Sequence, residues 1–166
     1  MIKIGDVIFV QNKGICRVEN ITKNAFVGCD KSKEYFVLKP VDVSNNMMVY
    51  FPTDTKLNMR ALTSKTKAEK LLKELINISN IDIKEEEKRF EVYNKITQSG
   101  DLEEWCRLLK TLLERKRKIQ KRQFNLQEQK YITTLTNCIL TELSYVLSKE
   151  KDEIKSSLID SLENIA

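Results

Sequence analysis

The hydrophobic periodicity of the chain changes once, near Ser64, from a spacing of about two residues to a spacing of about 3.6. Before Ser64, short apolar runs alternate with turn residues, as in β-strands, and after it apolar residues recur at helical spacing. A chain of 166 residues is long enough for two small cores. We therefore expect an α+β protein: an SH3-like or Tudor-like β-barrel over residues 1–57, followed by an all-helical bundle of about five helices over residues 63–166.

The first part contains five candidate strands. They are expected at residues 7–10, 15–21, 27–28, 33–39 and 47–51. The first two flank the sequence QNKG, which contains an Asn and a Gly suited to a tight hairpin turn. Pro52 is expected to end the last strand, because proline cannot donate a ladder hydrogen bond. Residues 52–63 lack glycine and contain apolar side chains, so we expect a short connection that packs partly on one domain.

Helix boundaries in the second part are marked by capping residues. A helix over residues 84–97 is expected to stop at Gly100. Asp101 with Glu104, and Asn125 with Glu128, have the spacing of capping boxes at the starts of two further helices.

The single tryptophan, Trp105, is in phase with the leucines of the expected third helix. This favours a core position over an exposed partner-binding position.

The residue types needed for catalysis and metal binding are scarce. The chain contains no histidine, and its four cysteines show no C-x-x-C spacing, which argues against zinc and other cofactors and makes an enzyme the least supported class. The cysteines could form two disulfides, but the apolar positions of Cys16, Cys106 and Cys138 favour buried free thiols. No window approaches the length of a membrane span and no secretory signal is visible, so we expect a cytoplasmic protein with no membrane contact.

Positive charge is concentrated in one stretch, although the net charge is only +5. The sequence RKRKIQKR places six cations among eight residues. Such a stripe can neutralise backbone phosphates without reading bases. The candidate DNA-contacting residues are Arg89, Arg115, Lys116, Lys118, Lys121 and Arg122. The alternative is a solvated helix C-terminus, where cations favour the helix dipole.

Two separated motifs resemble one protein family. The stretch IKIGDVIFVQNKGICRVENI, followed by KEYFVLKP and VYFP, resembles the N-terminal domain of the CarD/CdnL family of bacterial transcription regulators. The matching positions there are Gly5, Asp6, Val7, Gly14, Val18, Ile21, Tyr35, Leu38 and Lys39. Further on, KRFEVYNKITQSGDLEEW is similar to a second segment of the family. Its matching positions are Arg89, Asn94, Lys95, Ser99, Gly100 and Asp101.

The resemblance implies a function without chemistry. In that family the small barrel docks on the β subunit of RNA polymerase through a sheet edge, and the helical domain contacts promoter DNA and stabilises the open complex. By this resemblance, Tyr35, Lys39, Val49 and Tyr50 face the polymerase. We expect a monomeric bacterial protein that joins the nucleoid through polymerase.

The sequence departs from the family at two of these places. Glu86 stands about where family members carry a tryptophan that wedges into the minor groove, and a carboxylate is repelled by phosphates. Tyr50 stands where many members have an arginine. Two alternatives to the DNA-contacting regulator are therefore an adaptor that binds polymerase with little or no DNA contact, and a free-standing, non-specific nucleic-acid-binding protein.

Overall fold

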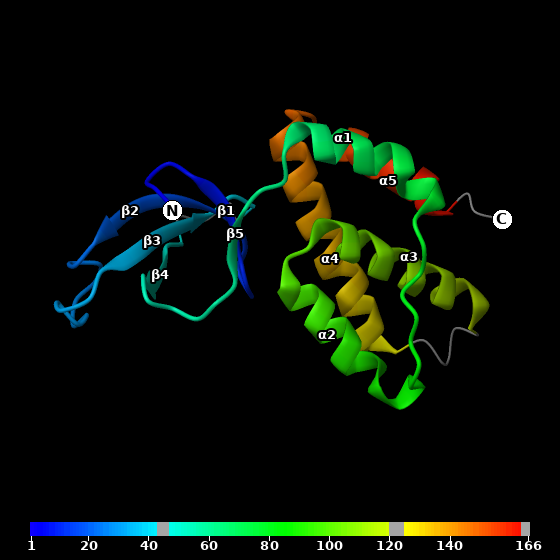
Figure 1. Ribbon diagram of the computed structural model, residues 1–166, viewed down its shortest axis with the longest axis horizontal. Coiled ribbons are helices and arrows are strands. Elements are labelled where there is room, and N and C mark those ends of the chain that lie inside the picture. Colours follow the sequence, from blue (N-terminus) through cyan, green and yellow to red (C-terminus); the bar gives the residue numbers. More distant parts are fainter. Residues whose placement is uncertain (43–46, 120–124, 164–166) are drawn as a thin grey trace. The chain divides into compact units, whose positions relative to one another are not determined.

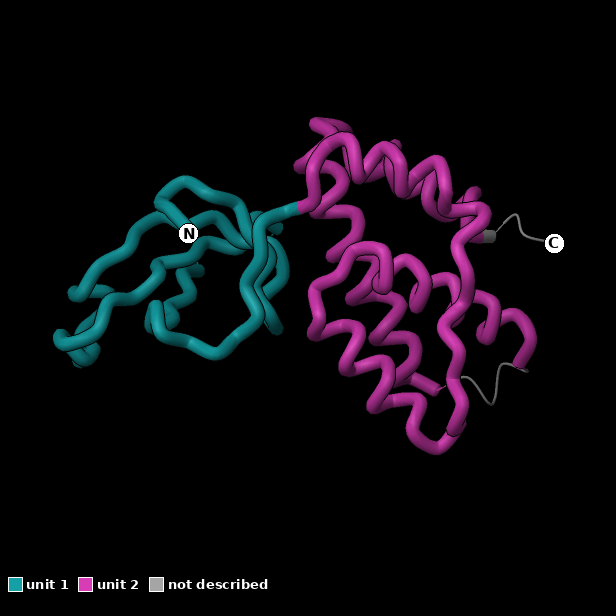
Figure 2. The backbone as a smooth tube through the Cα atoms, viewed as in Figure 1, with its two compact units in different colours: residues 1–62 teal, residues 63–166 magenta. Residues whose placement is uncertain are grey.

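The computed structural model describes residues 1–42, 47–119 and 125–163. It divides into two compact units, Met1–Leu62 and Thr63–Ala166 (Figure 2). All strands lie in the first unit and all helices in the second (Figure 1), which confirms the α+β prediction. The first unit ends at Leu62 and not at residue 57, because the segment after residue 57 contributes a strand.

The first unit is one antiparallel sheet. Its strands are β1 (Val7–Val10), β2 (Gly14–Thr22), β3 (Tyr35–Pro40), β4 (Val49–Pro52) and β5 (Met59–Ala61). Their order in the sheet is β4-β3-β2-β1-β5, so β4 and β5 are its two edges. The expected hairpin is confirmed: the turn between β1 and β2 uses positive φ at Asn12 and at Gly14 (64° and 77°).

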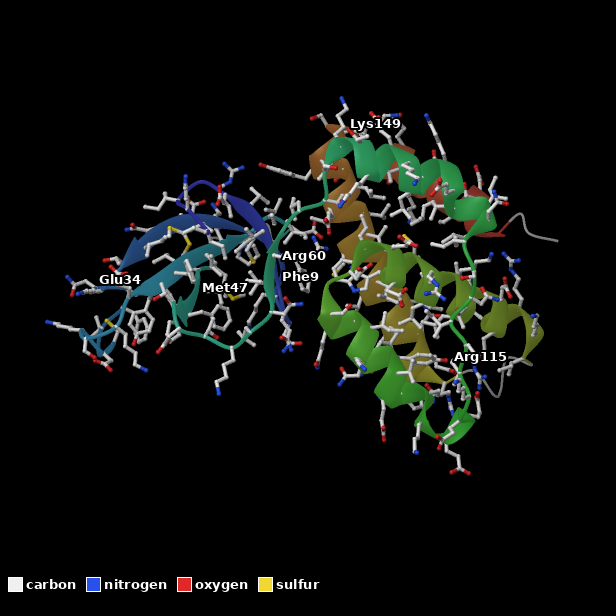
Figure 3. The ribbon with its side chains drawn as sticks, viewed as in Figure 1. Phe9, Glu34, Met47, Arg60, Arg115 and Lys149 are labelled. Atoms are coloured by element: carbon white, nitrogen blue, oxygen red, sulfur yellow. The ribbon has the colours of Figure 1, made fainter. Side chains whose placement is uncertain are left out.

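Two strand predictions are wrong. Residues 27–28 form no strand; they lie within a turn that the Cys29 amide closes by donating to the Phe26 carbonyl at 3.2 Å. The fifth strand is β5, within the stretch expected to be a connection, and Pro52 therefore ends β4 but not the last strand. A three-residue strand is too short to carry a period-two signal. It forms by pairing with β1, where Arg60 lies opposite Phe9 and its guanidinium stacks on that ring at 5.2 Å (Figure 3).

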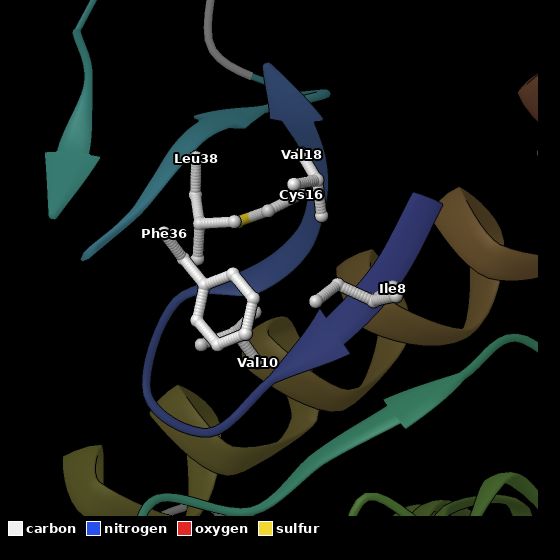
Figure 4. Packing of buried hydrophobic residues seen from close by; sticks show 6 residues of the cluster. All are labelled: Ile8, Val10, Cys16, Val18, Phe36 and Leu38. Atoms are coloured by element: carbon white, nitrogen blue, oxygen red, sulfur yellow. The ribbon is translucent and has the colours of Figure 1, made fainter. Parts of the chain in front are cut away.

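The core of the first unit lies on one face of the sheet. It consists of Ile8, Val10, Cys16, Val18, Phe36 and Leu38 (Figure 4). These residues alternate along β1, β2 and β3, as side chains on one face of a strand must. Val49 from one edge strand and Met59 from the other pack against this same cluster, so the sheet is curved around it.

The second unit contains five α-helices. They are α1 (Lys65–Glu74), α2 (Arg89–Ser99), α3 (Leu102–Lys118), α4 (Leu126–Leu147) and α5 (Lys151–Glu163), with 3-10 turns η1 (Leu75–Asn77) and η2 (Glu86–Lys88). Asp101 caps α3, and Asn125 forms a complete capping box with Glu128 at α4. In the part of the chain that the structure describes, no helix has the length and apolar character needed to cross a membrane.

The expected helix over 84–97 begins later than predicted, at Arg89, and continues to Ser99 before Gly100 ends it with a φ of 73°. The 3-10 turn η2 (Glu86–Lys88) directly precedes it, and residues 78–81 further back are tied to α3. The Lys110 ammonium donates to the Ile78 carbonyl at 2.5 Å, and the Ile81 amide donates to the Thr111 hydroxyl at 2.9 Å.

Trp105 is a core residue, as predicted. It is fully buried among the apolar side chains of the helical unit. Its indole N–H donates to the Ile96 carbonyl at 3.1 Å, near the end of α2. The side chain therefore fills the core and also fixes the corner between α2 and α3.

Alternation along β3 gives a test of the sheet. Leu38→Ala removes a fully buried side chain from the core cluster and is expected to reduce the free energy of unfolding by about 2–5 kcal/mol. Val37→Ala, on the opposite face one residue earlier, is expected to cost less than about 1 kcal/mol. Urea unfolding followed by circular dichroism measures both. Equal losses would contradict the described register.

Candidate partner-binding surfaces

The strand β4 has one unpaired side. Among the described residues, Val49, Tyr50, Phe51 and Pro52 pair with β3 alone. The Thr53 amide donates to the Glu34 carbonyl, and hydrogen-bonded pairs alternate with non-hydrogen-bonded pairs in an antiparallel ladder. Phe51 is therefore bonded to β3, whereas the N–H and C=O of Tyr50 point to the open edge. The edge can accept one more strand there.

An aromatic patch lies beside this edge. We use that name for Phe26, Tyr35 and Tyr50. The Phe26 ring lies 5.4 Å from the Tyr50 ring and 5.6 Å from the Tyr35 ring, between centroids. Phe26 is 47% exposed and Tyr50 is 36% exposed, and Val27 next to them is fully exposed. Exposed aromatic side chains held by neighbouring rings are typical anchors of protein interfaces.

The structure brings together three of the four predicted polymerase-facing residues. Tyr35, Lys39 and Tyr50 lie on the face of the sheet opposite the core, since Tyr50 pairs with Val37 between them. Tyr35 is only 7% exposed, and its hydroxyl accepts a hydrogen bond from the Asp30 amide, so it supports the patch from below. Val49 points the other way and packs on the core.

Sequence reasoning missed Phe26. It lies in the loop between β2 and β3, where no periodicity marks it, and its neighbours predicted a strand instead. Its place depends on the fold of the whole loop, which the Asp30 amide anchors to the Tyr35 hydroxyl at 3.2 Å. The one sequence signal available was that Phe26 is an aromatic residue in a loop that otherwise contains turn residues.

In the helical unit, two predicted DNA-contacting arginines are engaged in ion pairs with glutamates. We call Glu86, Arg89, Arg115 and Glu128 the arginine–glutamate cluster. The Arg115 Nε lies 2.8 Å and the Arg89 Nε 3.4 Å from Oε1 of Glu128, which is fully buried. Oε1 of Glu86 lies 2.5 Å from Nη2 of Arg115 and 3.7 Å from Nη1 of Arg89. The two positive charges thus face two negative ones.

A buried tyrosine adjoins this cluster. Tyr93 is fully buried, and its hydroxyl has no hydrogen-bond partner among the described residues. Its ring packs edge-on against Phe90 at 5.7 Å and Tyr131 at 5.5 Å. Burial, and next the nearby Glu128 carboxylate, raise the pKa of Tyr93 to about 12.

The remaining described cations of the basic stretch lie at the exposed end of α3. Lys116 donates to Gln129 at 2.9 Å, and Lys118 lies 3.5 Å from Glu114, on the same helix. Arg117 is also exposed. Lys121 and Arg122 lie outside the described residues. The helical unit has 20 Lys and Arg residues against 18 Asp and Glu residues, so any attraction for nucleic acid must come from such local concentrations of charge.

The four cysteines are free. Burial raises the pKa of Cys16 to about 11, and it also raises the pKa of Cys106. Both therefore remain thiols at neutral pH, as packing residues do. Among residues 1–42, 47–119 and 125–163, no three side chains of the metal-binding types gather into a possible site.

Comparison with known families agrees with the geometry of the first unit. Residues 2–63 match the CarD-like/TRCF RID domain, which confirms the resemblance to CarD-like proteins over the sheet unit. This match of the N-terminal unit supports an RNA polymerase-interacting protein. The matched residues end where the helical unit begins. No curated protein sequence matches the chain.

The buried carboxylate of the cluster should be important for stability. Glu128→Gln removes the charge that faces Arg89 and Arg115 and is expected to lower the free energy of unfolding by about 3 kcal/mol, since both guanidiniums lose their buried partner. Glu86→Gln, at a half-exposed carboxylate, is expected to cost less than about 1 kcal/mol. Chemical denaturation measures both, and equal costs would contradict this division of roles.

Tyr93 gives a pH-dependent test. Its folded-state pKa of about 12 lies above the ordinary value of 10.0, so the unfolded chain loses this proton first and stability falls as pH rises from about 10 to 12. Tyr93→Phe should remove that part of the fall. It should leave stability at neutral pH unchanged or raise it by about 1 kcal/mol, because the deleted hydroxyl has no partner. Thermal melting across this pH range measures it; a marked loss at neutral pH would contradict it.

Proposed function

We propose that this protein is a transcription regulator that docks on the β subunit of RNA polymerase through β4 and contacts promoter DNA non-specifically through its helical unit. The observation that carries the proposal is the open edge of β4 beside the aromatic patch, in a unit of the RNA polymerase-interacting family. Neither step requires chemistry at a catalytic residue.

Docking would extend the sheet by one strand. A partner strand alongside β4 can bond to the N–H and C=O of Tyr50, while Pro52 offers no donor and limits the pairing. The aromatic patch beside it favours an apolar side chain on the partner. Tyr50 in place of the arginine found in many family members thus replaces a charge contact with burial of apolar surface, which is less sensitive to salt.

DNA contact would come from the exposed end of α3. Lys116, Arg117 and Lys118 share this end, and the cations at 121 and 122 follow directly in the sequence. Lysine and arginine there attract backbone phosphates and read no bases. Polymerase docking raises the effective concentration of promoter DNA near the helical unit, so weak affinity is sufficient.

Regulation would then be a shift of populations. If the bound protein favours the melted promoter over the closed one, the equilibrium between the two states moves without any chemical step. A preference of about 1.4 kcal/mol changes that equilibrium tenfold.

One observation favours a second candidate, the adaptor that binds polymerase with little DNA contact. Glu86, which by resemblance stands at about the position of the family's wedge residue, pairs with Arg115 and Arg89. Two predicted DNA-contacting arginines are thereby compensated within the protein. The adaptor would regulate by recruiting another protein through its helical unit.

The docking step predicts the effect of two substitutions. Tyr50→Ala and Phe26→Ala should each weaken binding of the full-length chain to the β-subunit lobe about tenfold, because each removes an exposed ring of the aromatic patch. Tyr145→Ala, which removes an exposed tyrosine from the helical unit, is the matched control and should have no effect. Biolayer interferometry measures all three, and equal affinities would contradict the docking surface.

The DNA step predicts a charge-dependent effect. Reversing Arg117 and Lys118 to Glu should weaken binding of duplex DNA at least about tenfold and reduce its salt dependence, while polymerase binding stays unchanged. Reversing Lys65 and Lys67, two exposed lysines of α1, alters the net charge equally and serves as the control. If the two double variants weaken duplex binding equally, the effect comes from net charge and a specific contact at the end of α3 is contradicted. No effect of either on DNA binding or open-complex lifetime would favour the adaptor.

A further inference from the structure

The arginine–glutamate cluster contains one carboxylate that is fixed and one that is not. Glu128 is fully buried and accepts from the Asn125 amide as part of the α4 capping box, in addition to facing both arginines. Glu86 is 54% exposed and lies in the short turn η2, which has no side-chain cap. Glu128 is therefore part of the helix framework, whereas the Glu86 side chain can move into solvent without disturbing a helix.

Two guanidinium groups converge on one oxygen of this exposed carboxylate. Oε1 of Glu86 lies 2.5 Å from Nη2 of Arg115 and 3.7 Å from Nη1 of Arg89. Both arginines are themselves mostly buried, with side chains 24% and 21% exposed. Glu128 accepts a hydrogen bond from Nε of Arg115 at 2.8 Å and lies within ion-pair distance of Nε of Arg89, at 3.4 Å. Nη1 of Arg89 also donates to the backbone carbonyl of Glu86 at 3.2 Å. These contacts do not involve the Glu86 carboxylate, so they can persist when that side chain moves away.

A donor without a partner in the described part of the chain lies near the cluster. The Tyr93 hydroxyl is buried without a hydrogen-bond partner among the described residues, and it is close enough to feel the charges of Glu128, Arg115, Glu86 and Arg89. Buried hydroxyls are ordinarily hydrogen-bonded. A bound group with more oxygens than a carboxylate would give this hydroxyl an acceptor.

We propose that Arg89, Arg115 and the Tyr93 hydroxyl form a phosphate-binding site that the chain's own Glu86 carboxylate occupies and masks. A phosphate group displaces Glu86, places one oxygen between the two guanidiniums and offers another to Tyr93. Arginine pairs are suited to phosphate because their planar donors match its oxygens.

This site deepens the proposed function, on which its biological role rests. DNA contact would be weak while Glu86 occupies the cluster and stronger once a backbone phosphate replaces it, for example when docked polymerase holds the promoter nearby. The Glu86 carboxylate would then compete with a DNA phosphate for the two guanidinium groups, at about the position where CarD/CdnL family members carry a tryptophan wedge.

The test uses three isosteric variants of the full-length chain: Glu86→Gln, Glu85→Gln and Glu87→Gln. Each removes one negative charge from the same exposed turn. Glu85 pairs with Lys88 at 2.7 Å. Of these three glutamates, Glu86 is the one that pairs with Arg89 and Arg115 among the described residues. Fluorescence anisotropy with a short duplex, at several salt concentrations, measures affinity for a phosphate backbone. Calorimetry with inorganic pyrophosphate measures affinity for a free phosphate group.

Glu86→Gln should bind the duplex about fivefold more tightly than the parent chain, with a salt dependence steeper by about one phosphate contact, and the other two variants should change little. Tighter binding of pyrophosphate as well would identify a site for any phosphate group, and tighter binding of the duplex alone a site for the nucleic-acid backbone. Equal gains in all three variants, or no gain in either assay, would overturn the proposal.

A second substitution separates this site from the end of α3. Adding Arg115→Gln to Glu86→Gln should cancel the gain in duplex affinity. If thermal melting shows that this double variant is unfolded, Arg89→Gln in the Glu86→Gln background replaces it, with the same expected result. Reversal of Arg117 and Lys118 should leave the ratio between Glu86→Gln and its parent unchanged. The masked site and the proposed contact through α3 can therefore fail independently, and an undiminished gain in either folded double variant would overturn the site.

Discussion

The register of β4 against β3 is the constraint on which the proposed polymerase-docking surface depends. With Phe51 opposite Phe36, the side chains of Val49 and Phe51 join the core, and Tyr50 faces outward beside Phe26. The same register turns the backbone groups of Tyr50 to the open edge. A slip by one residue would exchange the two faces and bury Tyr50. The core and the docking edge are thus fixed by one pairing.

The helical unit shows why charge density in a sequence is an incomplete guide to binding. Arg115 belongs to the most basic stretch of the chain, yet it and Arg89 are paired with Glu128 and Glu86 from other segments. Those partners are distant in sequence, so no local pattern announces them. The cations at the exposed end of α3 therefore differ from the arginines of the cluster. The first are accessible, whereas the second are paired with glutamates of the protein itself.

Local signals in the sequence predicted the parts of the fold that local physics determines. Periodicity gave the division into strands and helices, and the capping residues Asp101 and Asn125 gave two helix starts. The strand β5 depends on pairing with β1, and the chain at Ile78 is held by a side chain of α3; in both cases the partners are distant in sequence, so no local window contains them. Tyr50 was a candidate docking residue by family resemblance, whereas Phe26 lies in a loop where neither a motif nor a periodic pattern marks it.

Hydrogen exchange of the full-length chain, alone and bound to the β-subunit lobe of RNA polymerase, tests the central claim most directly. The sheet formed by the described residues has two edges, β4 and β5, and we propose docking through β4. We predict that the Tyr50 amide becomes strongly protected in the complex, while the amides of β5 exchange as they do in the free protein. Protection confined to β5, or unchanged exchange at Tyr50 in a complex that has formed, would contradict docking through β4.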